Sequence, residues 1–342
     1  MEKITVNTND KCEIIIGENI WLSELKAKLS GRKCFVLTDD NVAALLKNTL
    51  NENFGDNVYI INGGEKNKNF FTLNQIFDAM ITAGLNRGGV LAALGGGVVG
   101  DMGGLAAGLY MRGTGLINIP TTLLAMADSS VGGKTAIDYG GYKNLIGMFY
   151  QPECVICDTA FLSSLSDREI LSGVGEIVKT AALDEKLFDK IYENKNNLKD
   201  RNFIASIIPE TVTVKKTIVE KDEKEKNGLR KYLNIGHTVG HMLEMRYMKK
   251  SHGEYVLEGL YYEMNIAKKA GITDKIFYEK FSDIIFSLIE MPNYDLNEEL
   301  FRTALMDKKN SEGKISVMAI ENAGKIKELR LTLKEFEQGM QK

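Results

Sequence analysis

The chain has 342 residues, of which 44% are apolar, so it can bury a sizeable core and is long enough for two domains. Its 43 basic and 46 acidic residues give a net charge of -3, which leaves no global basic field and argues against nucleic acid as a partner. The first residues carry scattered charges and lack the apolar segment of a secretory signal, which predicts a cytoplasmic protein.

The sequence predicts no membrane span and no disulfides. The best candidate for a span, 90–110, has Asp101 at its centre. A carboxylate at that depth costs about 2.5–3.5 kcal/mol in lipid, so we assign this stretch to a core. Four cysteines are too few for a disulfide framework, which predicts free thiols at Cys12, Cys34, Cys154 and Cys157.

Residues 1–160 alternate short β-rich runs with segments of helical spacing, which predicts βαβ units around a largely parallel sheet. The expected strands are EIIIG, KCFVLTD, NVYII, GVLAALGG, GLINIPT and CVICD. The predicted fold class is therefore an α/β N-terminal domain of the Rossmann-like, nucleotide-binding kind. Ligands bind such sheets at the carboxyl ends of their strands, where this sequence has Asp39, Asn41, Gly63, Gly64, Glu65 and Lys68.

A glycine-rich stretch, 95–147, holds 14 of the 33 glycines and predicts a close approach of backbone to a ligand. Gly95, Gly97 and Gly100 form a GxGxxG pattern directly after an expected strand, so backbone amides and a helix start can face a pyrophosphate. A Rossmann unit also carries an acidic residue about 20 positions further on, but here that zone reads GLINIPTT. We therefore expect an atypical dinucleotide site.

The next loop imitates a phosphate-binding P-loop without being one. Gly133, Lys134 and Thr135 match the end of that motif, but Asp128 stands where its first glycine is required, which excludes this type of ATPase. The loop and the later Lys143 still predict capture of phosphate or carboxylate.

From residue 161 the pattern becomes mainly helical, which predicts a second, mostly α domain over 161–342. The mixed-charge run EKDEKEK, 220–226, is typical of a solvated surface segment. KISVMAIENAGKIKEL predicts a hairpin near the C-terminus, and LKEFEQGMQK a final helix.

The only three histidines, His237, His241 and His252, lie within 16 residues of one another. This clustering favours a divalent metal site, with zinc as the first choice for imidazole and carboxylate ligands. Spacing alone favours His237 and His241 as the ligand pair, because positions i and i+4 share one face of a helix. Glu176, on a glycine-flanked helix, is the best candidate for the carboxylate.

Cations accompany the glycine-rich and helix-end motifs. Together with a metal and a nucleotide fold they predict a substrate with several negative charges, such as a phosphorylated acid. These cations are Arg112, Lys134, Lys143, Lys179, Lys215, Arg230 and Lys308.

Over nearly its whole length the sequence resembles the 3-dehydroquinate synthases, within the sugar phosphate cyclase family. The blocks that carry the resemblance are GGGVVGD at 95, YMRG at 110, PTTLLAMADSSVGGKTAID at 120, KNLIGMFYQP at 143, SGVGEIVK at 172, GLRKYLNIGHTVGHMLE at 228 and HGE at 252. The resemblance implies that 1–160 bind NAD, that 161–342 bind zinc or cobalt and the substrate, and that the chain forms a homodimer.

The resemblance also implies roles for single residues. Zinc would be bound by Glu176, His237 and His252, with His241 in the active site but off the metal, unlike the pair that spacing favours. Residues that match substrate-contacting positions are Arg112, Asp128, Lys134, Lys143, Asn144, Lys179, Lys215, Arg230, Asn234 and Lys308, with Lys309 as an alternative to Lys308. Those that match NAD-binding positions are Asp39, Asn41, Glu65, Lys68, Gly97, Val98, Val99, Gly100, Asp101, Thr121 and Thr122, together with Lys134 and Lys143. Gly175 and Thr180 replace the alanine and tyrosine usual in the family, which bears on packing.

The implied reaction converts 3-deoxy-D-arabino-heptulosonate 7-phosphate to 3-dehydroquinate and phosphate, a lyase step of the shikimate route to chorismate and the aromatic amino acids, with catalytic NAD. Three other functions remain open at this point. Another sugar phosphate cyclase, such as a 2-deoxy-scyllo-inosose synthase, would share the NAD and metal motifs, but Arg230 and Asn234 favour the keto acid. A metal-dependent polyol dehydrogenase has no use for so many cations, and a noncatalytic NAD-binding module leaves the histidine cluster unexplained.

Overall fold

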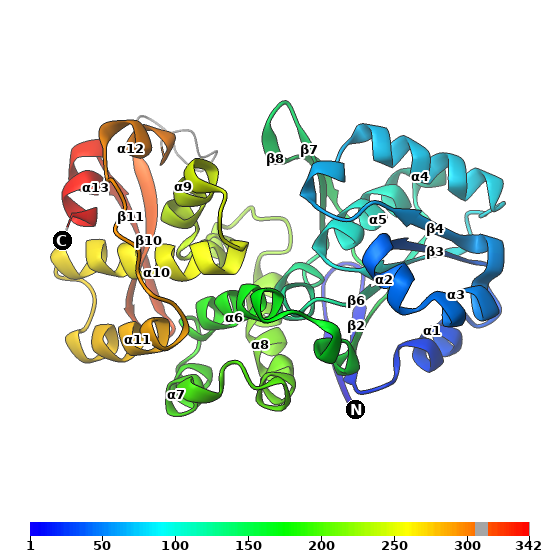
Figure 1. Cartoon of the computed structure of the whole chain (residues 1–342), viewed down its shortest axis with the longest axis horizontal. Coiled ribbons are helices and arrows are strands. Elements are labelled where there is room, and N and C mark those ends of the chain that lie inside the picture. The colour runs from blue at the N-terminus through cyan, green and yellow to red at the C-terminus, as the bar shows by residue number, and fades with distance from the viewer. Residues whose placement is uncertain (305–313, 342) are drawn as a thin grey trace. The chain divides into compact units, whose positions relative to one another are not determined.

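The computed structural model describes residues 1–304 and 314–341 (Figure 1). The chain divides into two compact units, Met1–Leu165 and Ser166–Lys342. The boundary expected from the sequence, after residue 160, falls inside the 3-10 segment Thr159–Ser164. Among the described residues, no helix is both long enough and apolar enough to cross a membrane.

The first unit, all of which the structure describes, consists of strands and helices in alternation. Its helices are α1 (Trp21–Leu29), α2 (Asp40–Leu45), α3 (Lys47–Phe54), α4 (Phe70–Thr82) and α5 (Gly97–Leu109). Its strands are β1 (Glu2–Val6), β2 (Cys12–Gly17), β3 (Cys34–Asp39), β4 (Val58–Ile61), β5 (Val90–Gly95), β6 (Gly115–Pro120), β7 (Lys134–Tyr139), β8 (Tyr142–Phe149) and β9 (Cys154–Asp158). The six strands predicted from the sequence are confirmed, and the four cysteines are free thiols.

The main sheet has seven strands in the order β1-β2-β9-β6-β5-β3-β4. Only the β1–β2 pair is antiparallel, so the predicted parallel sheet is confirmed. From β3 the chain crosses to β4 on one side, whereas from β5 it crosses to β6 on the other side. The carboxyl ends of β3 and β5 therefore flank a topological switch point, which is where open α/β sheets bind their ligands.

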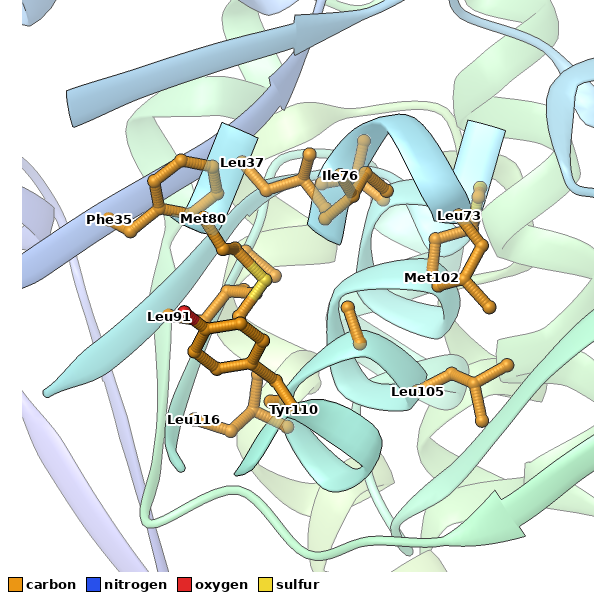
Figure 2. Packing of buried hydrophobic residues seen from close by; sticks show 14 of the residues in the cluster. Phe35, Leu37, Leu73, Ile76, Met80, Leu91, Met102, Leu105, Tyr110 and Leu116 are labelled. Atoms are coloured by element: carbon orange, nitrogen blue, oxygen red, sulfur yellow. The ribbon is translucent and has the colours of Figure 1, made fainter. Parts of the chain in front are cut away.

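The core of the first unit lies between this sheet and helices α4 and α5. Phe35 and Leu37 of β3 point toward these helices and share one cluster with Met80 and Met102 (Figure 2). Val36, which alternation directs to the other face, is also buried. Both faces of the sheet are thus covered, as parallel sheets require.

The hairpin β7–β8 packs on α5 instead of joining the sheet. A β-carbon on Gly104 of α5 would lie 2.3 Å from Cγ2 of Thr135, so only glycine allows this approach. Because Lys134 begins β7, the contact holds that lysine beside the helix that carries the glycine motif.

The second unit is mainly helical, as predicted. Its described elements are α6 (Asp167–Ala181), α7 (Glu185–Glu193), α8 (Arg201–Lys221), α9 (His237–Tyr247), α10 (His252–Lys269), α11 (Lys275–Leu288), α12 (Glu298–Ala304), β10 (Ile315–Asn322), β11 (Lys325–Leu331) and α13 (Leu333–Met340). The C-terminal hairpin and the helix after it are confirmed. The expectation of a solvated surface segment over 220–226 is wrong for Asp222, which is buried and accepts backbone N–H bonds.

Helices α9 and α10 approach each other closely at two glycines. A β-carbon on Gly259 of α10 would lie 1.9 Å from the carbonyl oxygen of Gly236, the residue before α9. At the same place Glu263 of α10 reaches across to α9: its carboxylate accepts hydrogen bonds from the amides of Gly236, at 2.8 Å, and Val239, at 3.1 Å. Because it accepts these two amides, the buried Glu263 caps the first turn of α9, where His237 lies.

Replacing Glu263 with Ala should lower the free energy of unfolding by about 2–4 kcal/mol, because two buried amide groups lose their acceptor. Urea unfolding followed by circular dichroism measures this change. Glu279→Ala is the matched control, since Glu279 on α11 is exposed and lies 3.9 Å from Lys275. The control should change stability little, and equal losses in the two variants would contradict the capping role.

Candidate active site and metal centre

The residues expected to bind NAD gather at the carboxyl edge of the main sheet. Asp39 ends β3, and its carboxylate accepts the Val42 amide at 3.0 Å, which starts α2. The glycine motif leads from the end of β5 into α5. The other residues of the set follow the same edge: Asn41 in α2, Glu65 and Lys68 after β4, and Thr121 and Thr122 after β6. Their role in cofactor binding remains a prediction.

Lys68 is the buried cation of this edge. Its ammonium lies 2.5 Å from Oδ2 of Asp101 and 3.7 Å from Oε1 of Glu65, and it also donates to Oδ1 of Asn144. Burial lowers the pKa of Lys68, but the carboxylates of Asp101 and Glu65 together outweigh burial and raise that pKa above its ordinary value. Lys68 is therefore a fixed positive charge that ties α5 to the hairpin β7–β8.

A small pocket lies at the glycine motif. Its lining includes Gly95, Gly96, Gly97, Gly100, Asp101, Asn118, Ser129, Ser130 and Lys134. Oδ1 of Asn118 and Oγ of Ser130 are buried and have no hydrogen-bond partner among the described residues. Such atoms need a partner, so the pocket fits a polar ligand or water. Sequence reasoning missed Asn118, because it lies in an apolar strand, whereas Ser130 belongs to the loop predicted to capture phosphate or carboxylate.

Three further predicted substrate residues lie in the segments on either side of β7. Asp128 belongs to a π-helical turn, Ala125–Ser129, just before the loop that leads to β7. Asn144, in β8, has a left-handed backbone, and its amide donates to Asp138 at 2.8 Å. Lys143 precedes it and is exposed.

Arg112 lies apart from this group. It follows the C-terminal end of α5, whereas the glycine motif lies at the N-terminal end of the same helix. Thirteen residues of helix span about 20 Å. Arg112 has a left-handed backbone with φ of 63° and lines a second pocket with Arg87 and Gln151. The first unit by itself therefore does not bring Arg112 to the other predicted substrate residues.

The second unit brings Glu176 and the histidines together from three helices. Oε1 of Glu176 on α6 lies 3.6 Å from Nε2 of His237 on α9 and 3.2 Å from Nε2 of His252 on α10. The ring of His241 lies 5.1 Å from that of His237 and 5.9 Å from that of His252, between centroids. One ligand atom from each of the three histidines lies within 4.8 Å of the others. The pair favoured by spacing, His237 and His241, and the set implied by the resemblance, Glu176, His237 and His252, therefore lie in one cluster.

These distances fit a divalent ion. A tetrahedral zinc ion with bonds of about 2.0–2.1 Å keeps neighbouring ligand atoms about 3.3 Å apart, close to both Glu176–imidazole distances. Neither buried oxygen of Glu176 accepts a hydrogen bond of normal geometry from a described residue, although Lys179 forms an ion pair with it. A carboxylate with imidazoles is a ligand set for zinc or cobalt.

The charges of the cluster support one another. Burial raises the pKa of Glu176, but Lys179 and His252 outweigh burial and hold that pKa well below its usual range. Burial lowers the pKa of His252, but its contacts with Glu176 and Glu244 outweigh burial and raise the pKa to about 9. Glu176 is therefore an anion, which is the form that binds a metal, whereas His252 must release a proton when its Nε2 binds one.

Three of the predicted substrate cations of this unit are buried: Lys179, Lys215 and Arg230. Arg230 donates to the carbonyl of Glu223 at 2.7 Å, and its amide donates to Asp222 at 3.1 Å. Lys179 is paired with Glu176, and Nε of Arg230 lies 3.8 Å from Oε1 of Glu225, so anions of the protein already accompany these two buried cations. Sequence reasoning missed Asp222, which holds the loop of Arg230, because its neighbours are all charged.

The remaining expected residues divide into described and undescribed ones. Asn234 is partly buried and ends the 3-10 segment Leu229–Asn234. Lys308 and Lys309 lie outside the described residues. A β-carbon on Gly175 would lie 2.3 Å from the carbonyl oxygen of Gly253, so the glycine that replaces the usual alanine allows α6 to approach α10 closely.

Comparison with known proteins assigns the family. The chain matches the models of the 3-dehydroquinate synthase N-terminal region over residues 58–172 and of its C-terminal region over 173–310. It is 37% identical to a 3-dehydroquinate synthase of Alkaliphilus metalliredigens over 98% of this chain and 97% of the relative. It is 40% identical to that of Clostridium acetobutylicum over 86% of this chain and 85% of the relative.

A solved structure shares the fold along the whole chain. It is a 2-deoxy-scyllo-inosose synthase in complex with carbaglucose-6-phosphate, NAD+ and Co2+, with a TM-score of 0.88, 24% identity and coverage of 99% of both chains. An α/β unit with a parallel sheet followed by a helical unit is therefore a known architecture, and the predicted fold class is confirmed. The family models and the relatives together show that the chain belongs to the 3-dehydroquinate synthase family.

Proposed function

We propose that this chain converts 3-deoxy-D-arabino-heptulosonate 7-phosphate to 3-dehydroquinate and inorganic phosphate. The observation that carries the proposal is that Glu176, His237 and His252 lie together although they come from three separate helices. The chain in which they do so belongs to this family. We also propose a cytoplasmic location, which suits an enzyme of a biosynthetic pathway, and a homodimer, which the resemblance set out above implies.

Two bound groups belong to the proposed reaction. The carboxyl edge of the main sheet, at the glycine motif, would hold NAD, and Glu176, His237 and His252 would hold a zinc or cobalt ion. When bound, the ion supplies a Lewis acid for a substrate hydroxyl, and NAD supplies a reversible acceptor of hydride. The solved 2-deoxy-scyllo-inosose synthase was crystallised with NAD+ and Co2+, which supports this pairing.

The chain's own residues have separate tasks in this proposal. Lys179, Lys215 and Arg230 bind the negative groups of the substrate and hold them in a buried setting, where charge attraction is stronger than in water. Lys134, which begins β7 and is exposed, would bind phosphate. His241 stands in the imidazole cluster and would transfer a proton to or from the substrate.

A combined assay of products tests the proposal. Protein, NAD, zinc and the heptulosonate phosphate should release one phosphate for each 3-dehydroquinate, with no net rise of absorbance at the NADH band, because the overall reaction is redox neutral. Phosphate release is followed colorimetrically and the carbocycle by mass spectrometry.

The same assay separates the other functions. Accumulation of NADH without phosphate would contradict the proposal and indicate a polyol dehydrogenase. Turnover of glucose 6-phosphate instead of the keto acid would indicate a cyclase of the inosose type. No turnover of either compound, with NAD still bound, would indicate a binding module.

Replacing His237 with Ala should reduce bound zinc from one ion per chain to a small fraction and abolish turnover, since the ion loses one of three proposed ligands. Zinc content is measured by atomic absorption after dialysis. Lys134→Ala is the contrasting variant: it should keep its zinc but lose about 100-fold in turnover. Full zinc content in His237→Ala would refute the ligand assignment.

A further inference from the structure

His252 contacts a carboxylate at each of its two ring nitrogens. Nε2 lies 3.2 Å from Oε1 of Glu176, and Nδ1 lies 3.2 Å from Oε2 of Glu244. The two nitrogens point away from each other in the plane of the ring, so Glu244 lies on the edge of the imidazole that faces away from Glu176. Glu244 can therefore hold this ring without occupying the position of an ion between Glu176 and Nε2.

Glu244 comes from the helix that also carries two of the histidines. His237, His241 and Glu244 stand at i, i+4 and i+7 of α9, which is one face of the helix. The side chain of Glu244 is 18% exposed and that of His252 is 31% exposed, so their contact is largely shielded from solvent. One helix face thus supplies two imidazoles and the carboxylate that meets the third.

The tautomer of an imidazole decides which nitrogen can bind a metal. A ring that binds through Nε2 must carry its proton on Nδ1, and an acceptor at Nδ1 fixes both the tautomer and the plane of the ring. His237 has such an acceptor in the backbone carbonyl of Ile235, 3.1 Å from its Nδ1. For His252 the acceptor is a side chain, so it can be changed by mutation.

We propose that Glu244 is a positioning residue that accepts the Nδ1–H of His252 and thereby directs Nε2 of that ring to the metal. The inference rests on the proposed function, because it needs a metal at the cluster. Glu244 is not itself a ligand, and its effect passes through the ring of His252.

Zinc binding and histidine NMR on the full chain test this role. The metal-stripped protein is titrated with Zn2+ against a chelating indicator. Long-range proton–nitrogen spectra of the metal-stripped protein labelled with ¹⁵N-histidine, recorded at alkaline pH where the imidazoles are neutral, then report the tautomer of each ring, and the chain has only three rings to assign. The variants are Glu244→Ala and Glu244→Gln. The control is Glu299→Ala. It removes an exposed carboxylate of α12 that lies 3.6 Å from Arg246, a residue of α9 like Glu244.

Glu244→Ala should weaken zinc binding by about 10- to 100-fold and let His252 populate both tautomers. Glu244→Gln should keep the Nδ1–H tautomer, because its amide oxygen still accepts, and should lose about 3- to 10-fold in affinity with the negative charge. Glu299→Ala should match the wild type in both measurements.

The outcomes separate this inference from the proposed function. Wild-type protein that binds no zinc would overturn both. Wild-type protein that binds zinc, with unchanged affinity and unchanged His252 tautomer in Glu244→Ala, would overturn the role of Glu244 alone. Should Glu244→Ala fail to fold, the Gln variant decides, and wild-type affinity in that variant would overturn the role.

Discussion

The second unit depends on the contacts that compensate the buried carboxylate of Glu176. A carboxylate without solvent is costly unless opposite charges or a metal compensate it. Here Lys179 on the same helix and His237 and His252 on two others surround it. Three helices must therefore keep fixed spacings, and close glycine contacts such as that of Gly259 with the start of α9 set those spacings. The same helix contacts therefore determine both the packing of the unit and the positions of the proposed metal ligands.

The proposed cofactor site of the first unit is built in a different way. Its donors at the glycine motif are backbone amides at the start of α5, whose direction the helix fixes. The switch point between β3 and β5 lies at the same edge of the sheet. The buried ion pair of Lys68 with Asp101 connects the segment after β4 to α5. The first unit thus offers backbone amides at this place, whereas in the second unit the proposed metal ligands are side chains.

Much of this could be predicted from the sequence, and what could not has a physical reason. The six parallel strands were predictable because β-branched runs end at polar or glycine signals, while the β7–β8 hairpin was missed because its strands are rich in polar residues and glycine. The histidine cluster followed from spacing in the chain. The roles of Glu244 and Glu263 did not, because periodicity shows which face of a helix is polar but not which neighbouring helix that face meets.

The central claim is that a carboxylate and imidazoles of the second unit bind one divalent ion. X-ray absorption at the zinc edge tests it most directly, because it reports the atoms bound to the ion. The account predicts one zinc per chain with only nitrogen and oxygen ligands at about 2.0–2.1 Å and the outer-shell scattering of imidazole. Sulfur ligands at about 2.3 Å, from the free cysteines of the first unit, or a shell of oxygen without imidazole, would contradict it.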